Sequence, residues 1–153
     1  MLRIWALVAA LLFAGGAFAH DFRLGGVTID HPWSRATPPG AKVAAGYLQI
    51  VNTSDAPVTL IGAEADFAEV QIHTMEVEGG MMRMAEVEGG ITVAPGETVT
   101  FAPGGLHIMF MNIAEPFAEG EVRTATLDFG DAGTVVVEFN VGAMGETHHP
   151  AHA

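Results

Sequence analysis

The chain has 153 residues, enough for one domain of ordinary size, and 50% of them are hydrophobic, which is enough to bury a core. Its formal net charge of −12 argues against binding to nucleic acid and against docking on anionic lipid, because both need a basic surface. The chain contains no cysteine, which excludes disulfides, zinc–thiolate sites, iron–sulfur clusters, thiol catalysts and blue-copper centres. The 8 methionines and 7 histidines are therefore the side chains left that bind soft metals.

The N-terminus has the features of a secretory signal peptide. Arg3 supplies a positive charge, and the apolar stretch 4–18 that follows is too short to span a bilayer comfortably. It ends in Ala17-Phe18-Ala19, which fits the small-x-small pattern of signal peptidase sites. An uncleaved membrane anchor is the alternative, but the small residues favour cleavage after Ala19. We therefore expect a signal peptide at 1–19 and a periplasmic product without stable membrane insertion.

The rest of the chain is expected to be all-β, because short runs of β-forming residues alternate with turns rich in Gly and Pro. This spacing is typical of an antiparallel sandwich or barrel. No long stretch has helical periodicity, and one helical turn is expected at 67–70. The expected strands are 43–51, 58–63, 70–77, 81–87, 91–93, 98–101, 106–113, 121–129 and 134–141.

One expected strand carries two kinds of soft metal ligand on a single face. Alternate residues of a strand share a face, so His107, Met109 and Met111 point one way. Ile108 and Phe110 point the other way, toward the expected core. Methionine on a half-buried face is commonly a packing residue, so this strand by itself leaves a metal site and simple packing both open.

A neighbouring hairpin carries a second group of the same ligands. His73 and Met75 share one face of the first strand, and Met82 and Met84 share one face of the next. A turn at 78–80 places these pairs within side-chain reach of each other. The spacing does not determine whether His73 or Met75 lies nearer to Met84, and a core edge filled with methionine is an alternative. Together, the strand and the hairpin indicate a mixed His/Met site, which suits Cu(I) better than Zn(II) or Mg(II).

The spacing of four of these residues resembles the signature of the periplasmic Cu(A) chaperone family, PCuAC, which is H-x10-M-x21-H-x-M. In this chain the pattern is His73-x10-Met84-x22-His107-x-Met109, with one extra residue in the second interval that we place in the turn Gly89-Gly90. If the extra residue shifted the register, His107 and Met109 would face the core. The resemblance also includes Asp30 to Gly40, Gly46-Tyr47-Leu48 and Pro103 to Met109.

The resemblance implies a cupredoxin-like Greek-key β-sandwich or barrel that binds one Cu(I) near its surface through His73, Met84, His107 and Met109. It implies a copper chaperone and not an enzyme. The function implied is the supply of copper for assembly of the Cu(A) centre of a terminal (cytochrome c) oxidase. The implied partners are the copper-bearing subunit of that oxidase and a Sco-type protein.

Cu(II) has separate candidate ligands at the two ends of the mature chain. Cleavage would make His20 the first residue, whose amine and imidazole could together chelate Cu(II). We expect the copper-binding β-domain to cover 20–142 and a disordered tail to cover 143–153, because the tail has no β pattern. The tail histidines either bind Cu(II) weakly or are simply solvated; they are His148, His149 and His152.

Two other functions are alternatives. The first is a metal-dependent periplasmic enzyme, but Ser34 and Ser54 are the only serines and neither lies in a nucleophile-elbow motif. A site filled by His and Met also leaves no obvious open position for activation of water. The second alternative is a secreted β-sandwich interaction domain, which would leave the clustering of His and Met unexplained.

Overall fold

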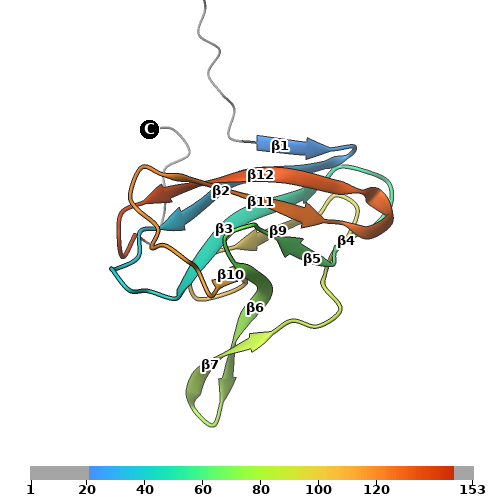
Figure 1. Cartoon of the computed structure of the whole chain (residues 1–153). Helices are drawn as coiled ribbons and strands as arrows, with labels where there is room; N and C mark the ends of the chain where they lie inside the picture. The colour runs from blue at the N-terminus through green and yellow to red at the C-terminus, as the bar shows by residue number, and fades with distance from the viewer. Residues whose placement is uncertain (1–20, 147–153) are drawn as a thin grey trace, which may run out of the picture.

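Strands form most of residues 21–146, which are the residues that the computed structural model describes (Figure 1). The expected signal peptide, His20 and the tail histidines lie outside these residues. The strands are β1 (Asp21–Leu24), β2 (Val27–Arg35), β3 (Val43–Asn52), β4 (Val58–Leu60), β5 (Gly62–Glu64), β6 (Glu69–Glu78), β7 (Met81–Glu86), β8 (Ile91–Val93), β9 (Thr98–Phe101), β10 (His107–Met111), β11 (Val122–Asp128) and β12 (Thr134–Gly142). One 3-10 helix, η1 (Gly130–Ala132), lies in the turn between β11 and β12. The all-β expectation is confirmed.

The strands form a β-sandwich whose main sheet has ten strands. The neighbours along this sheet are β5-β11-β12-β2-β3-β10-β6-β7, with β1 paired to β2 and β9 paired to β3. A second, two-stranded sheet joins β4 to β8. Figure 1 shows the β6–β7 hairpin projecting away from the body of the sandwich. Because β6 pairs with β10, the base of this hairpin continues the face of the central strands.

Two features of the N-terminal part were not expected from the sequence. The first is that β1 and β2 are strands at all, because Pro32 interrupts the β pattern in this region. The sheet accommodates Pro32 at an irregularity in the β2–β3 pairing between Asp30 and Trp33, where His31 adopts a φ of 49°. The second is that β2 pairs with β12 in parallel, whereas the other strand pairs in the described chain are antiparallel, as expected.

The prediction of a helical turn at 67–70 is wrong. The chain instead makes a tight turn closed by an isolated bridge between Ala65 and Ala68, and β6 begins at Glu69. The position of Phe67 explains this turn. Its ring lies 5.4 Å from that of Phe110 and 5.7 Å from that of Phe117, centroid to centroid. Tertiary packing of one aromatic ring therefore decides the backbone conformation here.

Strand β10 has one face in the core. Ile108 and Phe110 are both 0% exposed and belong to the core cluster. Gly46 of β3 lies opposite Ile108, and a Cβ atom on it would lie 2.9 Å from the ring of Phe139 and 3.0 Å from that of Phe110. This close packing holds β10 with its alternate residues, which include His107, on the opposite face of the sheet.

No helix in residues 21–146 has the length and apolarity needed to cross a bilayer.

Candidate metal centre

The strand pairing brings the candidate ligands of β10, β6 and β7 onto one face. His107 of β10 lies opposite His73 of β6, and Met75 of β6 lies opposite Met84 of β7. Directly opposed residues share a face, as do residues two apart on one strand. Met109 also lies on this face, two residues from His107. The extra residue between Met84 and His107 therefore has not turned His107 and Met109 toward the core.

The pairing of β6 with β7 also shows which candidate ligand on β6 lies nearest to Met84. Met75 is directly opposite Met84, whereas His73 is opposite Glu86. His73 and Met84 are consequently diagonal neighbours, about 7–8 Å apart between Cα atoms in regular antiparallel strands. The sequence left this point open because the register of a hairpin depends on the geometry of its turn.

A cavity of about 380 Å³ opens on this face. Its soft donors come from Met75, Met84, His107 and Met109, so three of the four residues of the signature line it together. The fourth, His73, lies beside the cavity, with its ring centroid 5.8 Å from that of His107. The remaining lining residues are Arg35, Val43, Ala44, Ala45, Tyr47 and Gly104.

The donors differ strongly in exposure. His107 is 5% exposed and Met109 is 6% exposed, so both are buried at the floor of the site. Met84 is 55% exposed, because it lies on the projecting hairpin. His73 and Met75 are intermediate. An ion bound here would therefore have buried donors on one side and a solvent-accessible donor on the other.

Hydrogen bonds assign a tautomer to each of the two imidazoles. The Nδ1 atom of His107 lies 3.0 Å from the carbonyl oxygen of Gly105, and the Nε2 atom of His73 lies 2.8 Å from the Oε1 atom of Gln71. Both oxygens only accept hydrogen bonds, so both of these nitrogens carry the proton and donate it. The other nitrogen of each neutral ring therefore has a free lone pair.

These two remaining nitrogens are buried without a hydrogen-bond partner: they are Nε2 of His107 and Nδ1 of His73. A buried polar atom without a partner is costly, and a metal ion is one way to satisfy it. Metal–imidazole bonds are about 2 Å long, so one ion bound to both rings is compatible with ring centroids 5.8 Å apart. The two imidazoles thus fit a shared metal ion, with the thioethers of the cavity as further donors.

The electrostatics of His73 favour the form that binds metal. Burial lowers the pKa of His73, and the neighbouring His107 lowers it further, while Glu86 opposes both effects. Only the neutral imidazole has a lone pair for a metal ion. The lowered pKa of His73 keeps the ring neutral to a more acidic pH than an exposed histidine.

Arg35 and Tyr47 close the cavity on the side of β2 and β3, and sequence reasoning did not identify Arg35. Its Nη2 atom donates a hydrogen bond of 2.9 Å to the hydroxyl of Tyr47, and its guanidinium lies 5.6 Å from the centroid of that ring. Burial raises the pKa of Tyr47, against the opposing effect of Arg35, so the phenol stays protonated. Arg35 lies in the segment Asp30 to Gly40, which the resemblance includes, but only the β2–β3 pairing brings it to the cavity.

Other candidate residues lie away from the centre. Met111 shares the face of Met109, but it lies opposite Glu69 and Val43 and does not line the cavity. Met82 is exposed on the hairpin, beyond Met84. Their places in the pairing make Met111 and Met82 suitable controls for the residues inside the cavity.

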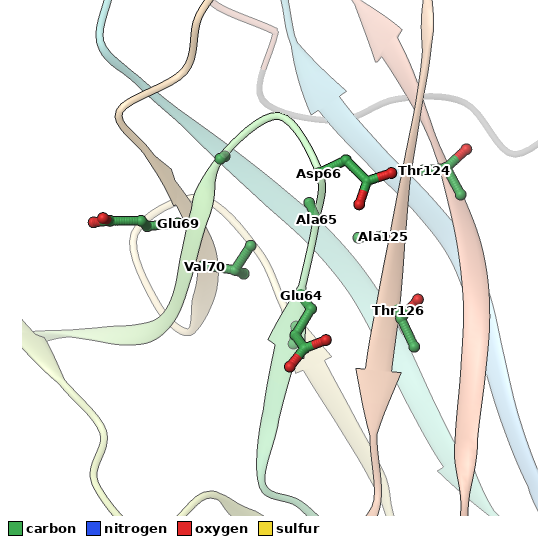
Figure 2. A pocket seen from close by; sticks show the side chains of 10 residues that line it. Glu64, Ala65, Asp66, Glu69, Val70, Thr124, Ala125 and Thr126 are labelled. Atoms are coloured by element: carbon green, nitrogen blue, oxygen red, sulfur yellow. The ribbon is translucent and has the colours of Figure 1, made fainter.

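A second hollow, of about 540 Å³, lies between β5, β6 and β11 (Figure 2). Its polar groups are carboxylates and hydroxyls, among them Glu64, Asp66, Glu69 and Thr124. It contains neither imidazole nor thioether. Within residues 21–146, no three His, Asp or Glu side chains come together as a metal site. The metal prediction therefore rests on the His/Met face alone.

Solved structures similar to this chain are PCuAC domains. The apo PmoF2 PCuAC domain is 30% identical, with a TM-score of 0.71, over 85% of this chain and 100% of that one. The copper-bound PCuAC domain from PmoF2 is 34% identical, with a TM-score of 0.68, over 81% and 98%. CuI-DR1885 from Deinococcus radiodurans is 32% identical, with a TM-score of 0.58, over 73% and 75%. The fold is therefore that of the PCuAC class of copper chaperone domains, which confirms the expected class and its cupredoxin-like β-sandwich.

The family described as "Putative lipoprotein LpqE-like" matches residues 27–141, and the chain belongs to this LpqE-like family. A curated relative is "Putative lipoprotein Lxx21020" from Leifsonia xyli subsp. xyli. It is 29% identical over 143 residues, which cover 88% of this chain and 85% of that protein. Both names describe lipoproteins.

Proposed function

We propose that this chain is a periplasmic copper chaperone that binds one Cu(I) ion as its cargo through His73, Met84, His107 and Met109. The observation that carries the proposal is the pair of buried imidazole nitrogens without partners beside a cavity lined by thioethers. The proposal is also supported by the similar structures described as copper-bound PmoF2 and CuI-DR1885.

The chemistry of the donors favours Cu(I) over harder ions. Thioether sulfur is soft and uncharged, and together with imidazole it suits Cu(I) better than Zn(II) or Mg(II). The cation Arg35 lines the cavity, whereas Glu86 lies opposite His73 and raises the pKa of that imidazole. These opposite charges do not select an ion by themselves. The softness of the donors therefore carries the preference for Cu(I).

The difference in solvent exposure among the proposed donors suits a protein that transfers its metal to a partner. His107 and Met109 would hold copper from the buried side, while Met84 is open to solvent. A ligand from a recipient protein can therefore replace Met84 first, before the buried donors release the ion. By the resemblance of the sequence, we propose the copper-bearing subunit of a cytochrome c oxidase as recipient, for assembly of its Cu(A) centre, with a Sco-type protein as a second partner.

We propose export with cleavage after Ala19. The signal-like N-terminus and the lipoprotein names of the relatives support export. The 153 residues contain no cysteine, so none of them offers a thiol for a thioether-linked lipid. Cleavage would release the domain into the periplasm. The family that this sequence resembles takes part in Cu(A) assembly in that compartment.

The proposal is tested by titrating the purified mature protein with Cu(I), in competition with a Cu(I) chelator, and with Zn(II) for comparison. We expect one tightly bound Cu(I) and much weaker binding of Zn(II). His73→Ala, His107→Ala, Met84→Leu and Met109→Leu should each weaken Cu(I) binding strongly, because each removes a donor from one small site. Met→Leu nearly conserves volume, so the loss can be assigned to the sulfur rather than to unfolding.

Met111→Leu is the matched control, because Met111 shares the face of Met109 but lies outside the cavity. Each apo variant is also melted thermally to check its fold. The four-residue site would be wrong if Met111→Leu weakened binding as much as Met109→Leu, or if His73→Ala had no effect. A preference for Zn(II) over Cu(I) would refute the proposed cargo.

A further inference from the structure

Met75 lies between the strands that carry the proposed copper donors. In the main sheet, β10 pairs with β6, and β6 pairs with β7. Neighbouring strands lie about 4.7–4.9 Å apart, so Met84 on β7 starts one strand further from β10 than Met75 does. Copper that contacts both His107 and Met84 must therefore lie over β6, close to Met75.

The side chain of Met75 is placed to contact that copper. It lines the same cavity as Met84, His107 and Met109. Gly104 also lines this cavity, and a Cβ atom there would meet nothing within 4 Å. The cavity that Met75 lines therefore has open space at Gly104.

Core packing does not account for Met75. Among the described residues, the side chains that form the core and those packed against it include neither Met75 nor Met84. The core residue of β6 is Ile72, three residues before Met75, and it points to the other side of the sheet. Two thioethers directly opposite each other, outside the core and in a shared cavity with His107, are the arrangement of a soft-metal site.

We propose that Met75 is a fifth copper donor, which forms with Met84 an outer position that Cu(I) occupies on its way out of the protein. This inference rests on the proposed function. Copper moves from the floor of the site, at His107 and Met109, toward the hairpin by exchange of ligands. A lone pair on the sulfur of Met75 forms a bond to copper while the bond from the nitrogen of His73 breaks. Copper stays Cu(I), and neither an electron nor a proton is transferred.

The first test follows the methionine methyl groups. The mature protein is labelled with 13C at the methionine methyls and titrated with Cu(I) to one equivalent, with signals assigned by Met→Leu variants. We expect the signals of Met84 and Met109 to shift fully and that of Met111 to stay in place. The signal of Met75 should shift by a smaller amount, because copper occupies the outer position for only part of the time. The second test measures how fast loaded protein gives Cu(I) to an excess of a chelator. We expect Met75→Leu to slow this release about tenfold, because the outer donor no longer stabilises the transition state for exchange.

Met82→Leu is the matched control for the release rate, because Met82 lies on the same face of the hairpin, opposite Val77 and outside the cavity. It should release copper at the rate of the unaltered protein. An unmoved Met75 signal, or an unchanged release rate in Met75→Leu, would overturn the proposal of an outer copper position. The proposed function would remain intact in that case, provided that the signals of Met84 and Met109 still shift. If no methionine signal shifts, the proposed function fails, and this inference fails with it.

Discussion

Gln71 is the residue that orients one of the two proposed imidazole ligands. Its Oε1 atom accepts the hydrogen bond from Nε2 of His73 over 2.8 Å, which leaves Nδ1 of His73 free for metal. Gln71→Leu removes this acceptor and leaves the ring free to rotate or to change its tautomer. We predict weaker Cu(I) binding although Gln71 itself does not bind copper. Gln71→Glu keeps an acceptor at the same position and should retain the affinity.

The size of the effect follows from the single hydrogen bond that is lost. One intramolecular hydrogen bond contributes about 0.5–1.5 kcal/mol net, which corresponds to a change in affinity of about 2- to 13-fold. Removal of the partner of a metal-bound histidine typically weakens metal binding about 10- to 100-fold. The two ranges meet near 10-fold. The bond is short and His73 is half-buried, so we expect Gln71→Leu to weaken Cu(I) binding about 10-fold.

The assay is competition against a Cu(I) chelator, with a thermal melt of each apo variant. Gln49→Leu is the control, because Gln49 makes a similar hydrogen bond to Thr100, 3.3 Å long, and neither of these two residues lines the cavity. It should leave Cu(I) binding unchanged. The tautomer assigned to His73 would be refuted if Gln71→Leu bound copper as tightly as the unaltered protein. It would also be refuted if Gln71→Glu were the weaker of the two variants.

Three further predictions concern the ends of the chain and one turn. The protein isolated from the periplasm should begin at His20, as N-terminal sequencing or intact mass would show, and retention of the first methionine would contradict cleavage. Deletion of 147–153 should leave Cu(I) binding unchanged and reduce Cu(II) capacity, because it removes three imidazoles; a loss of Cu(I) binding would place the tail in the main site. Gly90→Ala should destabilise the fold by about 1–3 kcal/mol more than Gly89→Ala, as measured by denaturant unfolding. Both glycines have a φ of 83°, but only at Gly90 would a Cβ atom collide with the carbonyl oxygen of Leu60, so equal losses would refute the reasoning.

The first four residues of the expected tail, 143–146, belong to the part of the chain that the structure describes. Residues 143–146 form a turn in which the backbone N–H of Glu146 donates to the carbonyl of Ala143 over 3.2 Å. The carbonyl of Glu146 accepts a hydrogen bond of 3.4 Å from Arg35, which lines the copper cavity. The deletion above therefore begins at 147, so that it removes the tail histidines and keeps this contact.

The sequence by itself determined the features that depend on local geometry. Alternation along a strand has a period of two residues, which is fixed by the covalent backbone. It therefore placed His107 and Met109 on the face opposite to Ile108 and Phe110, and the structure agrees. The Gly-rich turn between β6 and β7 likewise marked the hairpin that carries Met84.

Only the tertiary structure decided the features that depend on contacts between distant residues. The parallel β12–β2 pairing joins the two ends of the domain, and the β2–β3 pairing brings Arg35 to the cavity. The register of the hairpin placed Met75, and not His73, opposite Met84. The state of each imidazole depended on a neighbour, which for His73 is Gln71. Pairing and burial are settled by the packing of the whole chain, and the pattern along one strand contains no information about which partner the neighbouring strand will present.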